Sequence, residues 1–404
     1  MRSQSESMPE KRAIAAGRAA WGASWKPVLR SVAPGRVELL GNHVDYNGGP
    51  VLAAAIDRKA IALFEETRGP DSGIEIAFAD YGEYVQLETD FPGDWKNESG
   101  TQRPSDYARG ALAALHSRGR PIRPSRISLS SSVPAGIGVS SSAALCVALL
   151  QAMSFEPLTS NELILCAQEA EHRAGTPCGT MDQSASVAGG VILFNGATLE
   201  FERLSPSLGD MSFLVVDSGV HRSLASSSYP IRVSECKAAI ELLNGRFAAR
   251  LNHLAELSMN DFEHVAESVA DSGESLLFDR VRHVVEETAR VREGRTALEA
   301  LDWESFGALM TASGRSSATL YDISHPTVER IVNLMLTDPS VGGARMMGGG
   351  EGGSLIALVR NGADPDVRKR LERLVNSDLP AGASRREIFS FSFADGAEIV
   401  DLES

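Results

Sequence analysis

The segment that most restricts the fold of this chain runs from Ser131 to Leu150 and reads SSVPAGIGVSSSAALCVALL. A strand pattern, RISLSSSVP, ends near its start, a loop of small residues follows, and an apolar stretch typical of a buried helix completes it. Small residues let backbone N–H groups approach an anion, and a helix start adds N–H groups and the positive end of its dipole. The segment therefore predicts a phosphate site, whose candidate residues are Pro134, Gly136, Gly138, Ser140, Ser141 and Ser142.

Two common phosphate-binding motifs are excluded by their spacing. The chain has no G-x-x-x-x-G-K-[ST] sequence, and GIGVSS lacks the third glycine of the dinucleotide-binding fingerprint. The serine hydroxyls can cap the helix, or they can reach a phosphate oxygen or Mg²⁺. A glycine turn followed by a serine cap, without any ligand, stays open as a purely structural interpretation.

A second polar stretch, GRVELLGNHVDYNGG, spans residues 35–49 and includes the apolar residues of a strand. It places Arg36, Asn42, His43 and Asp45 close together in the sequence and ends on two glycines. Solubility does not require so many polar groups beside a buried strand. A site for a ligand rich in hydroxyl groups would use them as hydrogen-bond donors and acceptors.

The length of 404 residues exceeds that of one ordinary domain, and two domains are the central expectation. We place the boundary at the polar sequence SPSLGD, which gives domains 1–205 and 206–404. Strand patterns alternate with helices in the first half, whereas the second half is richer in helices. The expected helices are 11–21, 105–116, 143–153, 161–175, 233–245, 275–294, 305–320 and 325–337, and the expected strands are 28–33, 37–41, 51–66, 74–80, 84–89, 126–134, 212–220, 353–359 and 387–393, with a hairpin at 190–204.

The net charge of −14 argues against nucleic acid or an anionic membrane as a partner, because both bind basic surfaces. No apolar run approaches the roughly 20 residues of a membrane span, and the N-terminus shows no apolar signal region. The four cysteines have no paired spacing and are interpreted as reduced structural residues. We therefore expect a cytoplasmic enzyme, with the oligomeric state left open between a monomer and a weak dimer.

Five segments, taken in order, resemble the galactokinase branch of the GHMP small-molecule kinases. APGRVELLGNHVDYNGGPVLAAAI resembles the galactose-recognition signature, whose usual form is GRVNLIGEHTDYNGG, and VPAGIGVSSSAAL resembles the phosphate loop PxGxGLSSSA. AEHRAGTPCGTMDQSASVAGG, VDSGVHRSLASSSYPIRVSEC and ARMMGGGEGGSLIALV resemble three further motifs of the family. The resemblance implies a two-domain α+β fold with mixed sheets and helices, and an active site in the cleft between the domains. It also implies transfer of the γ-phosphoryl group of MgATP to the C1 hydroxyl of a galactose-like sugar.

The resemblance also implies roles for individual residues. Asp182 matches the catalytic aspartate that orients or deprotonates the sugar C1 hydroxyl, and Arg36 matches the arginine beside it. Ser142 and Glu171 match the hydroxyl and carboxylate that hold Mg²⁺. Residues matched to the sugar are Asn42, His43, Asp45, Gly179 and Tyr229, and Tyr107 joins the phosphate-loop residues at the ATP site.

Three positions depart from the usual family pattern. Asn42 replaces a glutamate that contacts the C6 hydroxyl of the sugar, Pro104 replaces an aromatic residue of the W-x-x-Y segment, and Glu351 replaces the phenylalanine of GGGFGG. Because of Asn42, a sugar altered at C6, such as galacturonate or arabinose, is kept as an alternative substrate to galactose. A non-catalytic sugar sensor is the alternative from another class, although Arg36 and Asp182 are both retained.

Overall fold

The computed structural model describes residues 7–67, 73–220, 228–247, 250–269, 275–380 and 383–402. One eight-stranded sheet has the strand order β12-β1-β2-β5-β3-β4, with β6 paired to β2 and β7 paired to β6. Its pairs are antiparallel except for β3 and β5, which run parallel. The strands of this first sheet are β1 (Leu29–Leu40), β2 (Pro50–Glu66), β3 (Ile74–Phe78), β4 (Glu83–Leu87), β5 (Ser125–Ser131), β6 (Val191–Asn195), β7 (Phe201–Leu204) and β12 (Glu398–Asp401).

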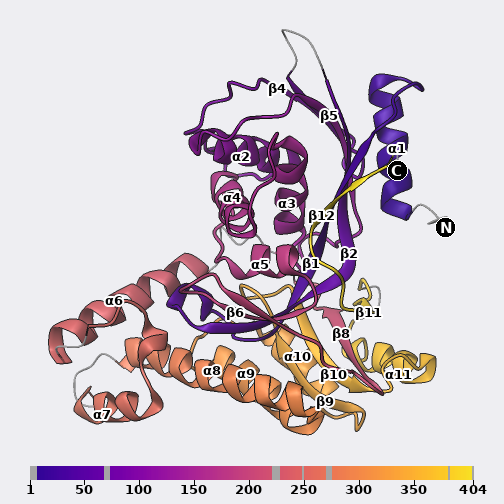
Figure 1. Cartoon of the computed structure of the whole chain (residues 1–404). Helices are drawn as coiled ribbons and strands as arrows, with labels where there is room; N and C mark the ends of the chain where they lie inside the picture. The colour runs from indigo at the N-terminus through magenta and orange to yellow at the C-terminus, as the bar shows by residue number, and fades with distance from the viewer. Residues whose placement is uncertain are drawn as a thin grey trace.

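Helices cover both faces of the first sheet (Figure 1). The N-terminal α1 packs on one face, and four helices form a layer on the other. α3 is nearly all apolar, which suits a helix surrounded by the sheet and its neighbouring helices. These helices are α1 (Met8–Trp21), α2 (Pro104–Ser117), α3 (Ser141–Met153), α4 (Ser160–Arg173) and α5 (Met181–Ala188).

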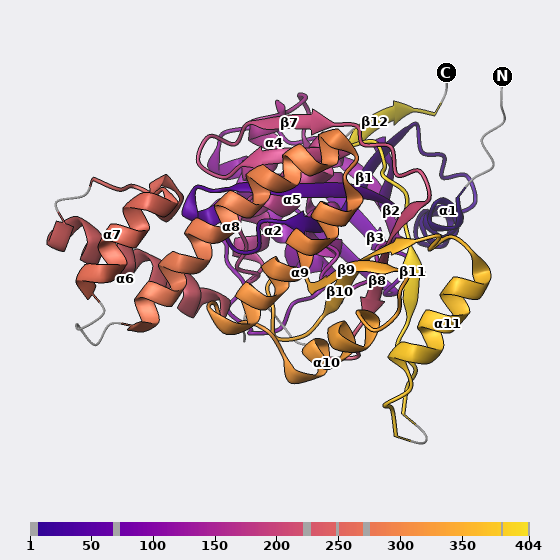
Figure 2. The same cartoon turned by 90° about the horizontal axis from the view of Figure 1, so that it is seen from below.

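A second sheet of four antiparallel strands, in the order β11-β8-β10-β9, forms the other part of the molecule. α8 and α9 form a hairpin that packs between this sheet and strands β1 and β2 of the first (Figure 2). The strands are β8 (Met211–Asp217), β9 (Val341–Met346), β10 (Ser354–Arg360) and β11 (Ile388–Ser390). The helices are α6 (Tyr229–Phe247), α7 (Met259–Val269), α8 (Ser275–Ala300), α9 (Trp303–Thr319), α10 (Pro326–Met335) and α11 (Pro365–Val375).

The predicted elements all coincide with observed ones, and the α+β class is confirmed. The strands expected at 28–33 and 37–41 are one strand, β1, whose pairing with β2 shifts register beside Pro34 and again between Glu38 and Leu40. The sequence did not predict α5, α7, α11, β9 or β12. The predicted boundary at 205/206 falls between β7 of the first sheet and β8 of the second, although β12 returns to the first sheet. Within the described part of the chain, no helix is long and apolar enough to cross a membrane.

Candidate active site

A cavity of about 430 Å³ lies where the first sheet, the helical layer and the glycine-rich loop after β9 meet. Its lining combines residues from the two polar stretches of the sequence with residues far away in the chain. The predicted site residues in its lining are Arg36, His43, Asp45, Tyr107, Gly136, Gly138, Ser140, Ser141, Ser142, Gly179, Asp182 and Tyr229. Among the described residues, three predicted ones lie outside the lining, namely Asn42, Pro134 and Glu171.

The loop between β5 and α3 has the backbone that its small residues predict. Gly136 and Gly138 have φ angles of 78° and 80°, in the left-handed region that favours glycine. Ser140 also lies in this region, with φ 61°, and α3 begins at the next residue. The Ser140 hydroxyl donates to Asp182 Oδ2 at 2.8 Å and does not cap α3, contrary to the capping use considered for it. The first turn of α3 therefore faces the cavity without a side-chain cap from its N-cap residue.

An ion pair joins β1 to the start of α5 across the cavity. Arg36 donates to Asp182 Oδ1 from Nε at 2.9 Å and from Nη2 at 2.6 Å. Arg36 also donates from Nη1 to the carbonyl of Gly138 at 2.7 Å, which fixes the guanidinium against the loop between β5 and α3. Asp182 lies in the first turn of α5, where the helix dipole favours a negative charge. Its side chain is 18% exposed against 4% for Arg36, so a ligand in the cavity can reach the carboxylate.

Ser142, which lines the cavity, and Glu171, which does not, form a second polar pair. The Ser142 hydroxyl donates to Glu171 Oε1 at 2.6 Å, and Gln183 donates to the other carboxylate oxygen. Burial raises the pKa of Glu171 to about 7, and the negative charge of Asp182 adds to this increase. A carboxylate in such a place is stabilised in its charged form by a nearby cation.

The other end of the cavity is built by the loop after β1 and the short helix η1 (Asp45–Asn47). His43 has φ 61°, and the Asn47 side chain holds this conformation by donating to the His43 carbonyl at 2.9 Å. The hydroxyl of Tyr46 lies 2.9 Å from His43 Nδ1 and 2.9 Å from the hydroxyl of Tyr321. The ring of Tyr229, at the start of α6, lies 5.1 Å from that of His43. The result is a rigid aromatic wall with hydroxyl and imidazole groups.

Asp45 faces this wall, and its neighbour on the opposite side is a glycine. Burial raises the pKa of Asp45 to about 6, while backbone N–H groups of Tyr46 and Met181 lower it in part. A Cβ atom added at Gly179 would lie 1.7 Å from Asp45 Oδ2. The Asp45 carboxylate therefore occupies space that a side chain at position 179 would fill.

A buried polar layer from α8 and α9 holds this loop from behind. Glu287 of α8 accepts hydrogen bonds from the backbone N–H groups of Gly41 at 2.9 Å and Asn42 at 3.2 Å. Arg290 Nε donates to its other oxygen at 2.6 Å, and the nearby Arg290 charge helps to lower the pKa of Glu287 to about 2 despite the opposing effect of burial. Glu287 is one of the residues that sequence reasoning missed.

His283, one turn before Glu287, belongs to the same layer. Its Nε2 lies 3.0 Å from the carbonyl oxygen of Asn42, which can only accept, so Nε2 carries the proton. Its Nδ1 lies 2.8 Å from the Ser316 hydroxyl, which therefore donates to it. Burial lowers the pKa of His283 to about 4, in agreement with a neutral ring. No role was expected for His283 from the sequence, but His283 fixes the loop that carries His43.

The sequence is similar to known proteins over most of its length. Residues 18–65 match the galactokinase galactose-binding signature, residues 106–190 match the GHMP kinases N terminal domain, and residues 295–376 match the GHMP kinases C terminal domain. The galactokinase of Thermotoga neapolitana is 33% identical over 378 residues, which cover 92% of this chain and 99% of that protein. The human galactokinase is 33% identical over 387 residues, which cover 93% of each chain.

The chain belongs to the galactokinase family of GHMP kinases. The crystal structure of Lactococcus lactis galactokinase complexed with galactose superimposes with a TM-score of 0.83 at 24% identity, covering 94% of this chain and 97% of that one. A mevalonate kinase superimposes with a TM-score of 0.60, at 19% identity and over 91% of this chain and 99% of that one. These structures share the two-domain GHMP kinase fold. The protein is thus a phosphotransferase of a family that uses ATP.

Asn42, which the family signature suggested as a sugar contact, does not line the cavity in the described structure. Its amide nitrogen donates to the Gly348 carbonyl at 2.9 Å and to Glu38 at 3.3 Å, and its amide oxygen accepts from Ser317 at 2.9 Å. The residue that does line the cavity is Glu38, two positions after Arg36 on β1. Alternate residues of a strand share a face, so this spacing was the signal that could have identified Glu38.

The opposite end of the cavity carries the second departure from the family pattern, Pro104. Pro104 is the first residue of α2, a position that suits proline because its missing N–H has no partner there in any helix. The Tyr107 hydroxyl lies 2.9 Å from Thr176 Oγ1, so it ties α2 to the loop before α5. Pro104, Tyr107 and the exposed Tyr81 all line this end of the cavity.

Glu351, the third departure, does not line the cavity in the described structure. Its carboxylate accepts a hydrogen bond from the backbone N–H of Ser228 at 3.3 Å, directly before α6. A negative charge at a helix N-terminus is favourable, and α6 carries Tyr229 into the site. Glu351 therefore supports the position of Tyr229 from outside the cavity.

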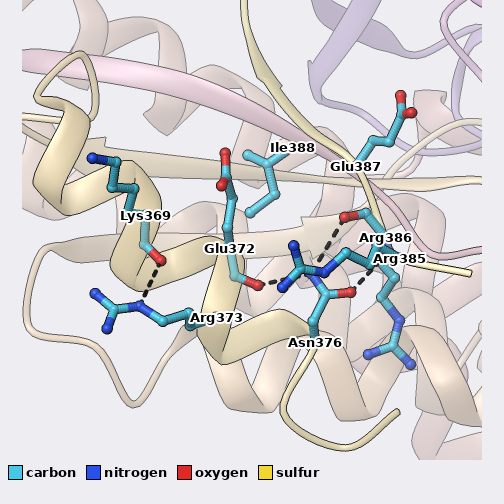
Figure 3. A pocket seen from close by; sticks show the side chains of 8 residues that line it. All are labelled: Lys369, Glu372, Arg373, Asn376, Arg385, Arg386, Glu387 and Ile388. Atoms are coloured by element: carbon cyan, nitrogen blue, oxygen red, sulfur yellow. Dashed lines mark hydrogen bonds between the residues drawn. The ribbon is translucent and has the colours of Figure 1, made fainter. Parts of the chain in front are cut away.

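A second hollow, of about 630 Å³, lies on the surface between α11 and the chain that leads into β11 (Figure 3). It holds several basic side chains, but its polar groups are used to fasten α11. Asn376 donates to Glu372 and Arg386 carbonyls and accepts from the Arg386 N–H, and Arg386 pairs with Asp378. None of the predicted site residues lies there, so the candidate active site is the cavity around Asp182.

Proposed function

We propose that the protein transfers the γ-phosphoryl group of ATP to the C1 hydroxyl of galactose. The observation that carries this proposal is the contact of Asp182 with both Arg36 and Ser140 in one cavity. One side of this contact is the phosphate loop, and the other side is the wall of hydroxyl-binding groups around His43 and Asp45. The relatives that carry the name galactokinase support galactose as the acceptor.

In this reaction the oxygen of the C1 hydroxyl attacks the γ-phosphorus, the bond to the bridging oxygen of ADP breaks, and the hydroxyl proton leaves. Asp182 accepts or orients that proton, because its carboxylate is accessible and lines the same cavity as the phosphate loop and the residues His43 and Asp45. Arg36 lies against Asp182 and the Gly138 carbonyl, so its positive charge stabilises the negative charge that develops on the transferring phosphoryl group.

The phosphates of ATP lie against the loop of Gly136 and Gly138 and the first turn of α3. The left-handed backbone of the two glycines and the uncapped helix start offer N–H groups without side-chain obstruction. The adenine ring enters the end of the cavity near Pro104 and Tyr107. Positioning and electrostatic stabilisation of this kind account for most of the catalysis in phosphoryl transfer.

The donor set fits Mg²⁺, because Ser142 and Glu171 offer a hydroxyl and a carboxylate oxygen 2.6 Å apart. The described residues contain no group of three or more metal-binding side chains, so the phosphates and water would complete the set. When bound, Mg²⁺ neutralises charge on the β- and γ-phosphates. Gln183 keeps the Glu171 carboxylate oriented, and burial excludes bulk water from it.

We keep the division into domains 1–205 and 206–404 as part of this proposal. β7 ends the first sheet before that boundary and β8 starts the second after it, so the cavity would lie between the two domains. A requirement for ATP agrees with the predicted cytoplasmic location.

A steady-state assay of ADP formation tests the proposal, with galactose, galacturonate, arabinose, fucose, N-acetylgalactosamine and talose as acceptors. We expect kcat/KM for galactose to exceed that for the other sugars by about tenfold or more. We expect Asp182→Asn to lower kcat by about 10²–10⁴-fold with little change in KM. Binding of ATP and galactose by the unmodified protein without turnover of any sugar would overturn the proposal in favour of a sugar sensor.

A further inference from the structure

Glu38 is a charged group in the cavity that the proposed mechanism does not use. It lies on β1 two residues after Arg36, it is 2% exposed, and it lines the cavity together with His43 and Asp45. The register of β1 against β2 shifts directly beside it, between Glu38 and Leu40. Such an irregularity changes the direction of side chains near the end of a strand, and at this point the Glu38 side chain lines the cavity.

The Glu38 carboxylate is held from the side of the second sheet. Arg345 of β9 is fully buried and donates from Nη2 to Glu38 Oε1 at 2.5 Å. Its Nη1 donates to the backbone carbonyls of Glu38 at 3.3 Å and Leu39 at 3.2 Å. One arginine therefore fixes both the carboxylate and the backbone that carries it, and it balances the buried charge.

The second carboxylate oxygen has one weaker contact, from the Asn42 amide nitrogen at 3.3 Å. An ionised carboxylate can accept about four hydrogen bonds, and Glu38 accepts one at each oxygen. The carboxylate thus retains acceptor capacity in a cavity where the surrounding charges already fix its position. The amide nitrogen of Asn42 has no free N–H group for a ligand, because it donates to both Gly348 and Glu38.

The sequence itself shows a reciprocal exchange at these two positions. The usual signature GRVNLIGEHTDYNGG has asparagine at position 38 and glutamate at position 42, whereas this chain has Glu38 and Asn42. Both the signature and this chain therefore have one glutamate and one asparagine at these two positions, but in the opposite order. The two residues are in contact, so the carboxylate stays within the same polar cluster but approaches it from the strand instead of the loop.

We propose that Glu38 is a specificity-determining residue whose carboxylate accepts a hydrogen bond from one hydroxyl group of the bound sugar, with Arg345 and Asn42 as its positioning residues. This inference rests on the proposed function, since it assigns a further contact in the same sugar site. The recognised chemistry is a hydroxyl donor, because a carboxylate flanked by an arginine and an amide can offer only acceptor oxygens.

The test measures kcat/KM for galactose and for its 2-, 3-, 4- and 6-deoxy analogues with the full-length protein. The variants are Glu38→Gln and Asn42→Glu, and the exchange variant Glu38→Asn/Asn42→Glu. We expect Glu38→Gln to lower kcat/KM for galactose by about 10–100-fold, mainly through KM. For one deoxy sugar, the analogue that lacks the bound hydroxyl, the loss is expected to stay below about threefold.

The exchange variant is expected to recover kcat/KM for galactose to within about fivefold of the unmodified protein, because it restores one carboxylate and one amide to the cluster. Asn42→Glu alone places two carboxylates against the single Arg345 and is expected to be the poorest of the three. Glu10→Gln is the matched control: Glu10 is a buried glutamate paired with Arg30 of β1 outside the cavity, and its loss should leave all five kcat/KM values unchanged.

An equal loss on galactose and on all four analogues in Glu38→Gln would overturn the inference and leave Glu38 a structural ion pair. Should the variants not fold, a crystal structure of the unmodified protein with galactose decides, because the inference requires a Glu38 oxygen within hydrogen-bond distance of a sugar hydroxyl. Galactose in contact with Asn42 and not with Glu38 would refute it. If the unmodified protein does not phosphorylate galactose, the proposed function fails, and this outcome is distinct from a failure of the inference about Glu38.

Discussion

Acidification should destabilise the protein at the loop after β1 that carries His43, and the size of the effect follows from the burial of His283. His283 is fully buried, hydrogen-bonded to the Asn42 carbonyl, and packed against Tyr321 with ring centroids 4.3 Å apart and the ring planes tilted by 33°. Its pKa falls from 6.5 to about 4 on folding, mainly because burial disfavours the charged ring. Glu287 opposes this decrease, whereas the positive charges of Arg290 and Arg345 add to it.

The sign of the effect follows from proton binding. Between pH 6.5 and about 4 the unfolded state binds a proton at this histidine and the folded state does not, so stability is lost as the pH falls. The lowered pKa corresponds to roughly 3 kcal/mol of the free energy of unfolding at neutral pH, of which about 2–3 kcal/mol is lost by pH 4.5. The raised pKa values of Asp45 and Glu171 act in the opposite direction, because those groups take up protons more readily in the folded protein.

Comparison of the unmodified protein with His283→Gln isolates this contribution. We expect the substitution to destabilise the protein by about 1–2 kcal/mol at pH 7, through the lost hydrogen bond and ring contact. The deficit should shrink or reverse by pH 4.5, because the variant has no histidine to protonate. Urea unfolding followed by circular dichroism at pH 7, 6, 5 and 4.5 gives the free energies, and His116→Gln, which removes an exposed imidazole, is the matched control. A deficit of the same size at all four pH values would refute the reasoning.

Three further predictions concern neighbouring residues. Glu287→Gln should lower the free energy of unfolding at pH 7 by roughly 3 kcal/mol. This deficit should vanish as the pH falls from 4.5 to about 2, because a carboxylate with a lowered pKa stabilises the fold only while it is charged. Thermal melts at these pH values measure the deficit, and a deficit that does not change with pH would contradict the prediction. Gly179→Ala should raise KM for galactose by about tenfold or more, since its Cβ would lie 1.7 Å from Asp45 Oδ2; unchanged galactose kinetics would show that the site absorbs the methyl group. Glu171→Gln should raise the Mg²⁺ concentration for half-maximal activity by roughly tenfold or more; a titration with unchanged midpoint would remove Glu171 from the metal site.

Much of the site could be predicted because its chemistry is concentrated in short stretches of sequence. The glycines and serines around the start of α3 predicted a phosphate loop by size and spacing, with a ligand-free turn left open, and the structure gives Gly136 and Gly138 the left-handed backbone that such a loop needs. The long helices were visible by their apolar periodicity. α5, with eight residues of which two are serines, has too little periodic pattern to predict a helix, although it carries Asp182.

The polar layer behind the loop could not be predicted, because its contacts join residues more than 240 positions apart. His283 and Glu287 are spaced by four on α8, so they share a helix face. In a sequence, a histidine and a glutamate on one face indicate a solvated surface more often than a buried one. Only the packing of α8 against the end of β1 places both side chains out of solvent.

Asn42 shows why a substitution interpreted alone can mislead. Read by itself, the change from the family glutamate suggested a binding site altered toward other sugars. The structure places Asn42 and Glu38 in contact beside the single buried Arg345, a cluster in which one carboxylate is neutralised and a second would not be. An unpaired buried charge costs about 3–5 kcal/mol, so a glutamate at either position favours an uncharged residue at the other. The two positions are therefore one unit of the site, and the pair of residues, rather than Asn42, determines which hydroxyl groups the cavity can accept.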